Sequence, residues 1–202
     1  MSKIFVSLVK DIVMKVIFSE NGLSVIEPDV HKDERGYFYE SFNEKEFKEK
    51  VADVNFVQDN ESCSSYGVIR GMHFQKPPYA QAKLVRVVKG AVVDFVVDIR
   101  KGSPNYGKVY YAYLSEENHR QFFVPRGFAH GFVALKDNTV FQYKCDNFYN
   151  KESEGAIFWM DPDIKIPWAD FINFSDVNVS EKDKTNKLLE EIDNPFVYGE
   201  NC

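Results

Sequence analysis

Cysteine is scarce in this chain of 202 residues, which contains only Cys63, Cys145 and Cys202. An odd, widely spaced set without a C-x-x-C pair forms neither a disulfide framework nor a cysteine zinc site. We therefore expect a reducing, cytoplasmic setting. No apolar run reaches the ~18 residues of a membrane span. Charged residues interrupt the apolar N-terminal stretch, which also lacks a small-residue cleavage site, so we expect neither a signal peptide nor a membrane partner.

An excess of positive charge is also absent. The 25 Lys and Arg residues are outnumbered by 31 Asp and Glu residues, which gives a formal net charge of −6. This balance argues against a broad electrostatic contact with nucleic acid or anionic lipid, so we expect no nucleic-acid partner. A local basic pocket for a phosphate-bearing small molecule is compatible with it.

Two common catalytic centres have no signature in the sequence. A hydrolytic serine often stands in an elbow motif such as G-x-S-x-G, and the chain has none. Many metal-binding β-barrels carry an H-x-H pair, but Gly71 and Gln75 stand two residues either side of His73. His31, His119 and His130 form no close pair, and we interpret His31 and His119 as surface residues. We therefore expect no metal site.

Short strand-like segments dominate what is present, with 18 Phe and 11 Tyr among them. Turn residues such as Lys89-Gly90 separate these segments. In "AVVDFVVDIR", residues 91–100, strict alternation places Val93, Phe95, Val97 and Ile99 on one face. Many short strands at regular spacing predict an all-β fold, and we expect one jelly-roll barrel domain over residues 1–202.

Helical patterns are confined to two places. One is short, at residues 43–51. The other begins at Ser180, a natural N-cap, and places Leu188, Leu189 and Ile192 on one apolar stripe. The sequence therefore predicts a short C-terminal helical segment within a tail over residues 180–202.

One segment, "GVIRGMHFQ" at residues 67–75, carries too many polar groups for a strand that only packs. Strict alternation separates Arg70 from His73, but a bulge at Gly71 would turn both to the same side. Lys83 opens a later strand, and Tyr143 lies within another. Histidine as base, lysine as fixed positive charge and tyrosine as acid suit proton abstraction beside a carbonyl, because an ammonium stabilises the developing enolate oxygen.

Eight motifs occur in a characteristic order: "DERGYFYESF", "FVQDNES", "GVIRGMHFQ", "QAKLVRVVKGAVVDFVVDIRKGSPNYG", "VPRGFAHGF", "YKCDNFYNKESEG", "DPDIKIPW" and "SEKD". Together they resemble the dTDP-4-dehydrorhamnose 3,5-epimerase family over roughly residues 22–190. The resemblance implies a cupin-like jelly-roll homodimer that uses no metal and no cofactor. It implies inversion of C3 and C5 of a dTDP-linked 4-keto-6-deoxyhexose in dTDP-L-rhamnose biosynthesis.

The resemblance also implies roles for single residues. It makes His73 the base, with Asp183 as the carboxylate that orients it. It places Lys83 beside the C4 oxygen and makes Tyr143 the proton donor. The substrate and nucleotide contacts that it implies are Arg35, Phe38, Glu40, Gln58, Asp59, Asn60, Arg70, His130, Tyr149 and Glu154.

The chain departs from the family pattern in three places. Residues 1–13 form an N-terminal extension, and an insertion precedes the "SEKD" motif. Glu61 and Cys63 stand where many members carry His and Arg, which would alter a nucleotide contact.

Structural interpretations stand beside the functional ones. His73 also fits a core histidine, and Lys83 a strand-edge lysine. Asp183 lies three residues after Ser180, where a carboxylate supports a helix N-terminus. Arg35 and His130 both lie close to turns. For the whole chain, the alternatives are an epimerase that inverts only C3 or only C5 of another nucleotide-linked 4-keto-deoxysugar, and a non-catalytic sugar-nucleotide binding module. The latter predicts a broken catalytic set, which the sequence does not have.

Overall fold

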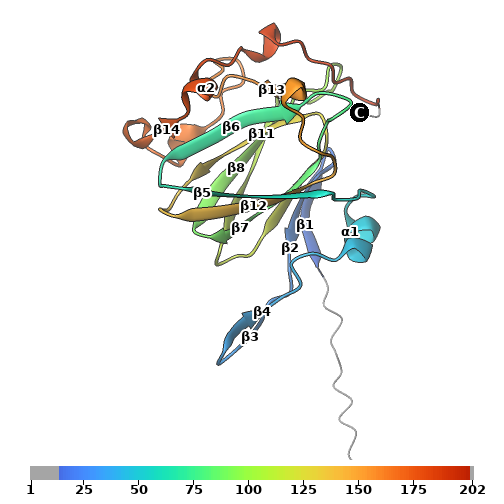
Figure 1. The fold of residues 1–202 in the computed structure, drawn as a ribbon, viewed down its shortest axis with the longest axis vertical. Coiled ribbons are helices and arrows are strands. Elements are labelled where there is room, and N and C mark those ends of the chain that lie inside the picture. The colour runs from blue at the N-terminus through green and yellow to red at the C-terminus, as the bar shows by residue number, and fades with distance from the viewer. Residues whose placement is uncertain (1–13, 201–202) are drawn as a thin grey trace, which may run out of the picture.

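Two β-sheets packed face to face form the body of the protein in a computed structural model that describes residues 14–200 (Figure 1). The N-terminal extension predicted at residues 1–13 lies outside the described residues, as does Cys202. The first sheet has the order β1 (Lys15–Glu20), β2 (Leu23–Glu27), β10 (Gln121–Val124), β7 (Lys83–Lys89), β12 (Thr139–Cys145) and β5 (Gln58–Ser64).

The second sheet has the order β13 (Glu154–Ala156), β6 (Val68–Gln75), β11 (Phe128–Ala134), β8 (Ala91–Asp98) and β9 (Val109–Ser115). Its neighbours run antiparallel, and the short strand β14 (Asn178–Val179) adds a parallel pairing with β6. The all-β prediction is confirmed, with the cavity that matters for function enclosed between the two sheets.

Helices are short, and one prediction for them was only partly right. Helix α1 (Glu44–Lys50) is capped by the side chain of Asn43, and α2 (Glu181–Lys184) by that of Ser180. The remaining helical turns are the 3₁₀ segments η1 (Lys151–Ser153), η2 (Trp168–Asp170), η3 (Phe174–Asp176) and η4 (Leu189–Glu191). Within the described residues no helix is long and apolar enough to cross a membrane.

The helical pattern read from Ser180 to Ile192 is therefore broken after one turn. Long-range backbone contacts explain the break. The backbone N–H of Leu189 donates to the Asp161 carboxylate at 2.8 Å, and Phe158 N–H donates to the Lys187 carbonyl at 2.7 Å. Groups that pair with residues 158 and 161 cannot also complete a helix.

Strand β8 is buried on both faces. The alternation holds, because Val93, Phe95 and Val97 share one cluster and Val92 and Val96 belong to another. The first cluster lies on the outer face of the second sheet, where the C-terminal segment covers it with Trp159 and Trp168. The second cluster lies between the sheets. Because both faces of β8 are buried, its residues are apolar apart from Asp94 and Asp98.

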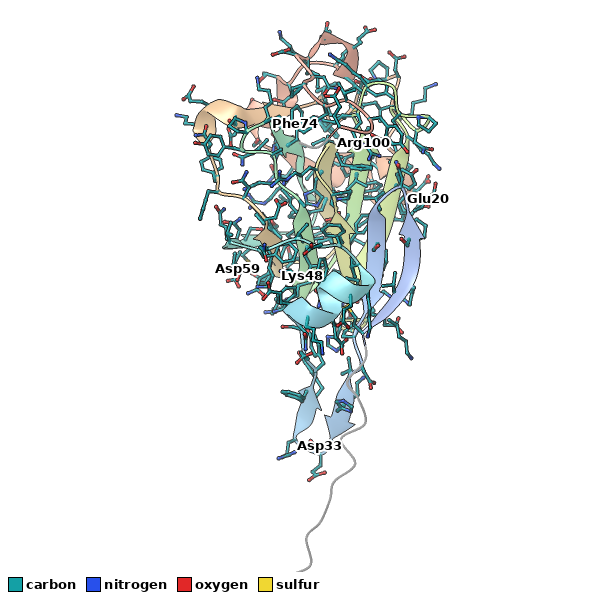
Figure 2. All side chains as sticks on the ribbon, turned by 90° about the vertical axis from the view of Figure 1, so that its right-hand side faces the viewer. Glu20, Asp33, Lys48, Asp59, Phe74 and Arg100 are labelled. Carbon is teal, nitrogen blue, oxygen red and sulfur yellow. The ribbon has the colours of Figure 1, made fainter. Side chains whose placement is uncertain are left out.

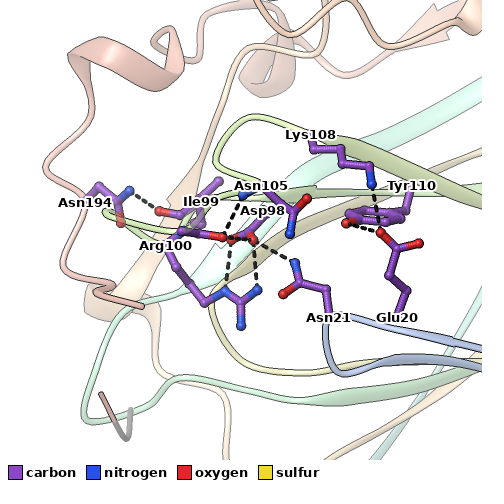
Figure 3. A network of polar contacts seen from close by, with 10 residues as sticks. Glu20, Asn21, Asp98, Ile99, Arg100, Asn105, Lys108, Tyr110 and Asn194 are labelled. Atoms are coloured by element: carbon purple, nitrogen blue, oxygen red, sulfur yellow. Dashed lines mark hydrogen bonds and ion pairs between the residues drawn. The ribbon is translucent and has the colours of Figure 1, made fainter. Parts of the chain in front are cut away.

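A polar cluster closes one end of β8 (Figure 3). Asp98 is fully buried there and accepts hydrogen bonds from Arg100 Nε at 2.9 Å, Ser103 Oγ at 2.7 Å and Asn21 Nδ2 at 2.8 Å. Burial alone would raise the pKa of Asp98, but these donors outweigh it and hold the pKa below its ordinary value. The cluster ties the β1–β2 turn to the loop after β8.

A two-stranded hairpin, β3 (His31–Asp33) with β4 (Gly36–Phe38), projects away from both sheets (Figure 1). Every residue of its strands is exposed. Figure 2 shows Asp33 near its tip, well away from the labelled side chains of the body. The rings of Tyr37, within β4, and of Tyr39, just after it, both pack against His119, which is only 6% exposed. The surface position predicted for His119 is thus wrong, because the hairpin base folds over it.

Candidate active site

A cavity of about 500 Å³ opens between the two sheets. Six of the residues singled out from the sequence line it: Arg70, His73, Lys83, His130, Tyr143 and Asp183. A second cavity of about 360 Å³ shares His73, Lys83 and Tyr143 with it and adds Tyr149 and Glu154. The predicted base, cation and acid therefore stand where the two spaces meet.

The base and its carboxylate form a close pair. His73 Nε2 lies 2.6 Å from Oδ1 of Asp183, although 110 residues separate them. Asp183 is 4% exposed and also accepts at 3.4 Å from Asn186. Burial raises the pKa of this carboxyl, but the hydrogen bond and charge of His73 outweigh it, so the pKa falls below its ordinary value. An ionised Asp183 fixes the ring of His73 and stabilises its protonated form.

The same carboxylate has its backbone in a helix cap. The Asp183 N–H donates to Ser180 Oγ at 3.1 Å. Only the backbone of Asp183 takes part in the cap, because its carboxylate reaches His73 instead of the helix N-terminus. The insertion noted before the "SEKD" motif does not shift the carboxylate out of reach.

An irregularity in β6 brings Arg70 and His73 to one side. His73 pairs with His130 of β11 and Arg70 with Phe132, so three residue steps along β6 match two along β11. At Gly71 φ is +141°, and a Cβ there would come within 2.6 Å of the Gly131 Cα. Glycine is required by both the conformation and the space. The bulge expected at this position is confirmed.

Lys83 and Tyr143 face the base from the opposite sheet. Lys83 Nζ lies 5.7 Å from the centre of the Tyr143 ring. Burial lowers the pKa of Lys83 and raises that of Tyr143, the nearby Cys145 having only a secondary effect on each. An ammonium withdrawn from water acts more strongly on a nearby oxygen. The tyrosine hydroxyl keeps its proton to higher pH than an ordinary phenol.

A second histidine–carboxylate pair includes His130, which lines the same cavity, and Asp94 behind it. Nε2 of His130 is 2.8 Å and 3.0 Å from the two carboxylate oxygens of Asp94, which is fully buried. Burial raises the pKa of Asp94, and the charges of His130 and Lys83 offset this only in part. The sequence reading did not select Asp94. An aspartate in the middle of a valine-rich strand was the signal that could have found it.

The mouth of the cavity carries hydrogen-bonded polar groups. Glu154 accepts from the Tyr149 hydroxyl at 3.1 Å and from Lys182 Nζ at 2.6 Å. Gln58 accepts from the Tyr149 N–H at 3.0 Å and donates to Asn60 at 3.1 Å. Of these, Tyr149, Glu154 and Lys182 line the second cavity, and Gln58 of β5 holds the backbone beside them. Lys182 was not singled out from the sequence, where it is one of several lysines around Asp183.

Four predicted contacts lie elsewhere in the same chain. Asp59 points to the opposite face of β5 from Gln58 and is paired with Lys144 at 3.0 Å. Glu40 accepts from Asn43, the cap of α1, at 2.9 Å. Arg35 and Phe38 belong to the projecting hairpin, where both are exposed. The cavity of one chain does not bring these four together with His73.

Among residues 14–200, no three His, Cys, Asp or Glu side chains are placed so that they could hold a metal ion. The polar groups in and around the cavity instead include two histidine–carboxylate pairs, a lysine, a tyrosine and Arg70. Such a set moves protons and stabilises an oxyanion.

Comparison with known proteins agrees with this chemistry. The family model for dTDP-4-dehydrorhamnose 3,5-epimerase matches residues 19–191. The epimerase of that name from Methanothermobacter thermautotrophicus is 50% identical over 173 residues, which cover 86% of this chain and 92% of that protein.

Two crystal structures are similar over most of the chain. The dTDP-4-dehydrorhamnose 3,5-epimerase of Elizabethkingia anophelis has 52% identity and a TM-score of 0.83, with 90% of this chain and 98% of that chain covered. The dTDP-6-deoxy-D-glucose-3,5-epimerase of Legionella pneumophila, in complex with dTDP-4-keto-L-rhamnose, has 45% identity and a TM-score of 0.84, with 90% and 95% covered. By sequence, fold and site chemistry alike, the chain belongs to the dTDP-4-dehydrorhamnose 3,5-epimerase family.

Proposed function

We propose that this protein inverts C3 and C5 of dTDP-4-keto-6-deoxy-D-glucose and so forms dTDP-4-keto-L-rhamnose on the route to dTDP-L-rhamnose. The observation that carries the proposal is the His73–Asp183 pair on one wall of the cavity with Lys83 and Tyr143 on the other. A base and an acid on opposite walls can remove a proton from one face of a carbon and return one to the other.

His73 takes the proton in the first step. Because its Nε2 bonds to Asp183, Nδ1 is the nitrogen left to accept the proton from carbon. The electron pair of the broken C–H bond forms a double bond between that carbon and C4. The π electrons of the C4 carbonyl move to its oxygen, which becomes the enolate oxygen. Asp183 balances the charge that forms on the imidazole.

Lys83 stabilises the enolate oxygen, and Tyr143 completes the inversion. C3 and C5 both flank C4, so one polarised carbonyl acidifies both carbons. The Tyr143 hydroxyl delivers its proton to the face opposite His73, and the enolate collapses to the ketone. The tyrosine then recovers a proton from solvent and His73 releases its own, so that the enzyme returns to its starting state.

The nucleotide part of the substrate needs cations and a polar mouth. Arg70 lines the cavity with its guanidinium held by Ser64 Oγ at 3.1 Å and the Cys63 carbonyl at 3.3 Å. We assign it to the diphosphate, for which an arginine fork is suited. The mouth residues Gln58, Asn60, Tyr149 and Glu154 are assigned to the nucleoside, while Asp59 serves to hold Lys144.

A homodimer explains why predicted substrate contacts lie on the hairpin. Arg35, Phe38 and Glu40 cannot serve the cavity of their own chain while the hairpin projects, but they can serve the cavity of a second copy. The edge strand β1 supports an interface, since all six of its residues are exposed, Val16, Ile17 and Phe18 among them. Light scattering after gel filtration would measure the mass, and a monomer would contradict the dimer.

We place the enzyme in the cytoplasm. Cys63 and Cys145 are unpaired in the described part of the chain, as expected for a reducing compartment. Burial raises the pKa of the Cys145 thiol to about 11, so it stays protonated and inert.

Proton NMR in heavy water tests the reaction. The enzyme is incubated with dTDP-4-keto-6-deoxyglucose and coupled to a 4-keto reductase. Deuterium at both C3 and C5, with dTDP-L-rhamnose formed, is the expected result. Deuterium at one carbon only would make the protein a single-carbon epimerase. Binding of dTDP without exchange at either carbon would favour a non-catalytic sugar-nucleotide module.

A further inference from the structure

We propose that His119 and Arg86 are positioning residues that fix the base of the β3–β4 hairpin and thereby set where Arg35 meets the nucleotide of the partner copy. The inference rests on the proposed dimeric function and gives two side chains outside the cavity a part in substrate binding. Its first support is how little else holds the hairpin.

Apart from Tyr37, whose ring packs on His119, the strands of the hairpin make few contacts with the rest of their own chain. All residues of β3 and β4 are exposed, and within residues 14–200 the hydrogen bonds of Arg35 go to Asp33, at 2.9 Å from its N–H and 3.0 Å from Nε. A two-stranded ribbon of this length is not rigidly placed by itself. Its direction is therefore set at its base.

His119 is clamped in that base. Its ring centre lies 4.7 Å from that of Tyr37 and 4.9 Å from that of Tyr39, and the two tyrosine rings lie 6.0 Å from each other, so the three rings form one cluster in which both tyrosines contact His119. Its backbone has φ of +54° and donates to the Ser115 carbonyl at 3.0 Å, which fixes it in the turn after β9. Burial, followed by the charges of Lys32 and Arg86, lowers the pKa of His119. A neutral ring stacks without the cost of burying a charge.

Arg86 adds a directional hydrogen bond to Tyr39, one of the two tyrosines that contact His119. Its Nη1 donates to the Tyr39 hydroxyl at 2.8 Å, and its Nη2 donates to Gln142 Oε1 at 2.8 Å. Gln142 in turn donates to Glu61 at 2.6 Å, which orients the amide. Glu61, one of the departures from the family pattern, thus belongs to the chain of bonds that holds the hairpin.

Arg86 and Gln142, which together anchor Tyr39, lie on the strands that carry the catalytic groups. Arg86 lies three residues after Lys83 on β7, and Gln142 immediately precedes Tyr143 on β12. Alternation puts the anchor on the outer face of these strands. The hairpin base is therefore fixed to the two strands that carry Lys83 and Tyr143, and the hairpin carries that orientation to Arg35. A displacement of about 1 Å at a binding group is enough to weaken its contacts severely.

His119→Asn is the first variant to test, because asparagine tolerates the left-handed backbone but has no ring. We expect KM to rise about tenfold and kcat to change less than about twofold, since the proton-transfer groups are untouched. The affinity for dTDP should fall by a similar factor in calorimetry. Tyr39→Phe is the matched milder variant: it keeps the stacked ring, removes only the hydroxyl that Arg86 reaches, and should raise KM about threefold.

A double-mutant cycle with Arg35→Ala separates positioning from general destabilisation. If His119 acts through Arg35, then His119→Asn combined with Arg35→Ala is no worse in KM than Arg35→Ala alone. Multiplying effects, or an unchanged KM in both His119→Asn and Tyr39→Phe, would overturn the inference while leaving the epimerase function standing. If the wild-type protein neither binds dTDP nor turns over the substrate, both the proposed function and this inference are wrong.

Discussion

Two buried aspartates on one strand show how differently the molecule uses the same side chain. Asp94 and Asp98 lie four residues apart on β8, share a face and are both fully buried. Arg100 and Ser103 help to saturate Asp98 with hydrogen bonds. Among residues 14–200, the hydrogen bonds of the Asp94 carboxylate go to His130, which lines the cavity.

The pKa values of the two aspartates shift in opposite directions because Asp98 has more hydrogen-bond donors around it than Asp94. Donors around Asp98 outweigh the effect of burial, and its pKa is lowered. Burial dominates at Asp94, and its pKa is raised. A carboxylate surrounded by donors stabilises the folded chain, whereas one left with few donors keeps an electrostatic influence on what enters the cavity. One end of β8 is therefore built for stability and the other for chemistry.

His73→Ala should give the largest effect and should confine it to the cavity. Loss of a positioned general base lowers kcat by up to about 10⁴-fold, equivalent to about 5.5 kcal/mol. We expect dTDP affinity to stay close to that of the wild type, because the nucleotide contacts are assigned to other residues, while the melting temperature should fall because the buried Asp183 carboxylate loses its partner. Stopped assays, calorimetry and thermal melting measure the three quantities. Loss of both turnover and nucleotide binding would indicate a structural role for His73.

Asp98→Asn should give the largest loss of stability. The substitution places an amide against the Arg100 guanidinium, and breaking such a buried pair costs about 3–5 kcal/mol. For a chain of this length that lowers the melting temperature by about 10 °C. Because the folded pKa is depressed, the stabilisation is present at neutral pH and is lost as the pH falls through the folded pKa. The kcat of the folded variant should match the wild type, and a large loss of kcat would contradict the division between the two ends.

Asp94→Asn makes the matching change four residues away. Asparagine still offers one oxygen to His130 and removes a charge that burial already disfavours, so stability should change by less than about 1 kcal/mol. We expect kcat to fall about tenfold, because the negative charge that faces Lys83 is gone and His130 is less firmly oriented. Thermal melting and kinetics on the same samples test both. A melting temperature as low as that of Asp98→Asn would mean that both aspartates are structural.

Local pattern predicted much of this architecture. Alternation in "AVVDFVVDI" gives the two faces of β8 correctly, and the glycine in "IRGMH" predicts the bulge that unites Arg70 and His73. These features depend on neighbours within a few residues, so sequence spacing carries the information. The pairing of His73 with Asp183 came from the resemblance, and the 2.6 Å distance supports it.

Features that depend on distant segments were missed. Nothing near Asp94 announces His130 as its partner or shows that a C-terminal segment buries the outer face of its sheet. The predicted length of the second helix was wrong because Asp161 captures the Leu189 N–H. The burial of His119 depends on a hairpin some 80 residues earlier in the chain. In each case the deciding contact is long-range, and local propensity is overridden by it.

Among the cavity variants, Lys83→Arg should lower the rate least, and its pH profile tests the charge of Lys83 directly. The enolate needs the ammonium form, and burial holds the pKa of Lys83 below the ordinary lysine value, so kcat/KM should decline as pH rises through that lowered pKa. Burial shifts the pKa of Tyr143 in the opposite direction, so the two ionisations respond differently to the cavity. An arginine stays protonated to about pH 12 or beyond, so the alkaline decline should move upward in the variant, while the plateau drops several-fold because the guanidinium fits the site less well.

A decline at the same pH in both enzymes would assign it to another group and would mean that the Lys83 charge does not limit the rate. The profile measured for Asp98→Asn should coincide with that of the wild type, since the saturated end of β8 contributes no charge to the cavity.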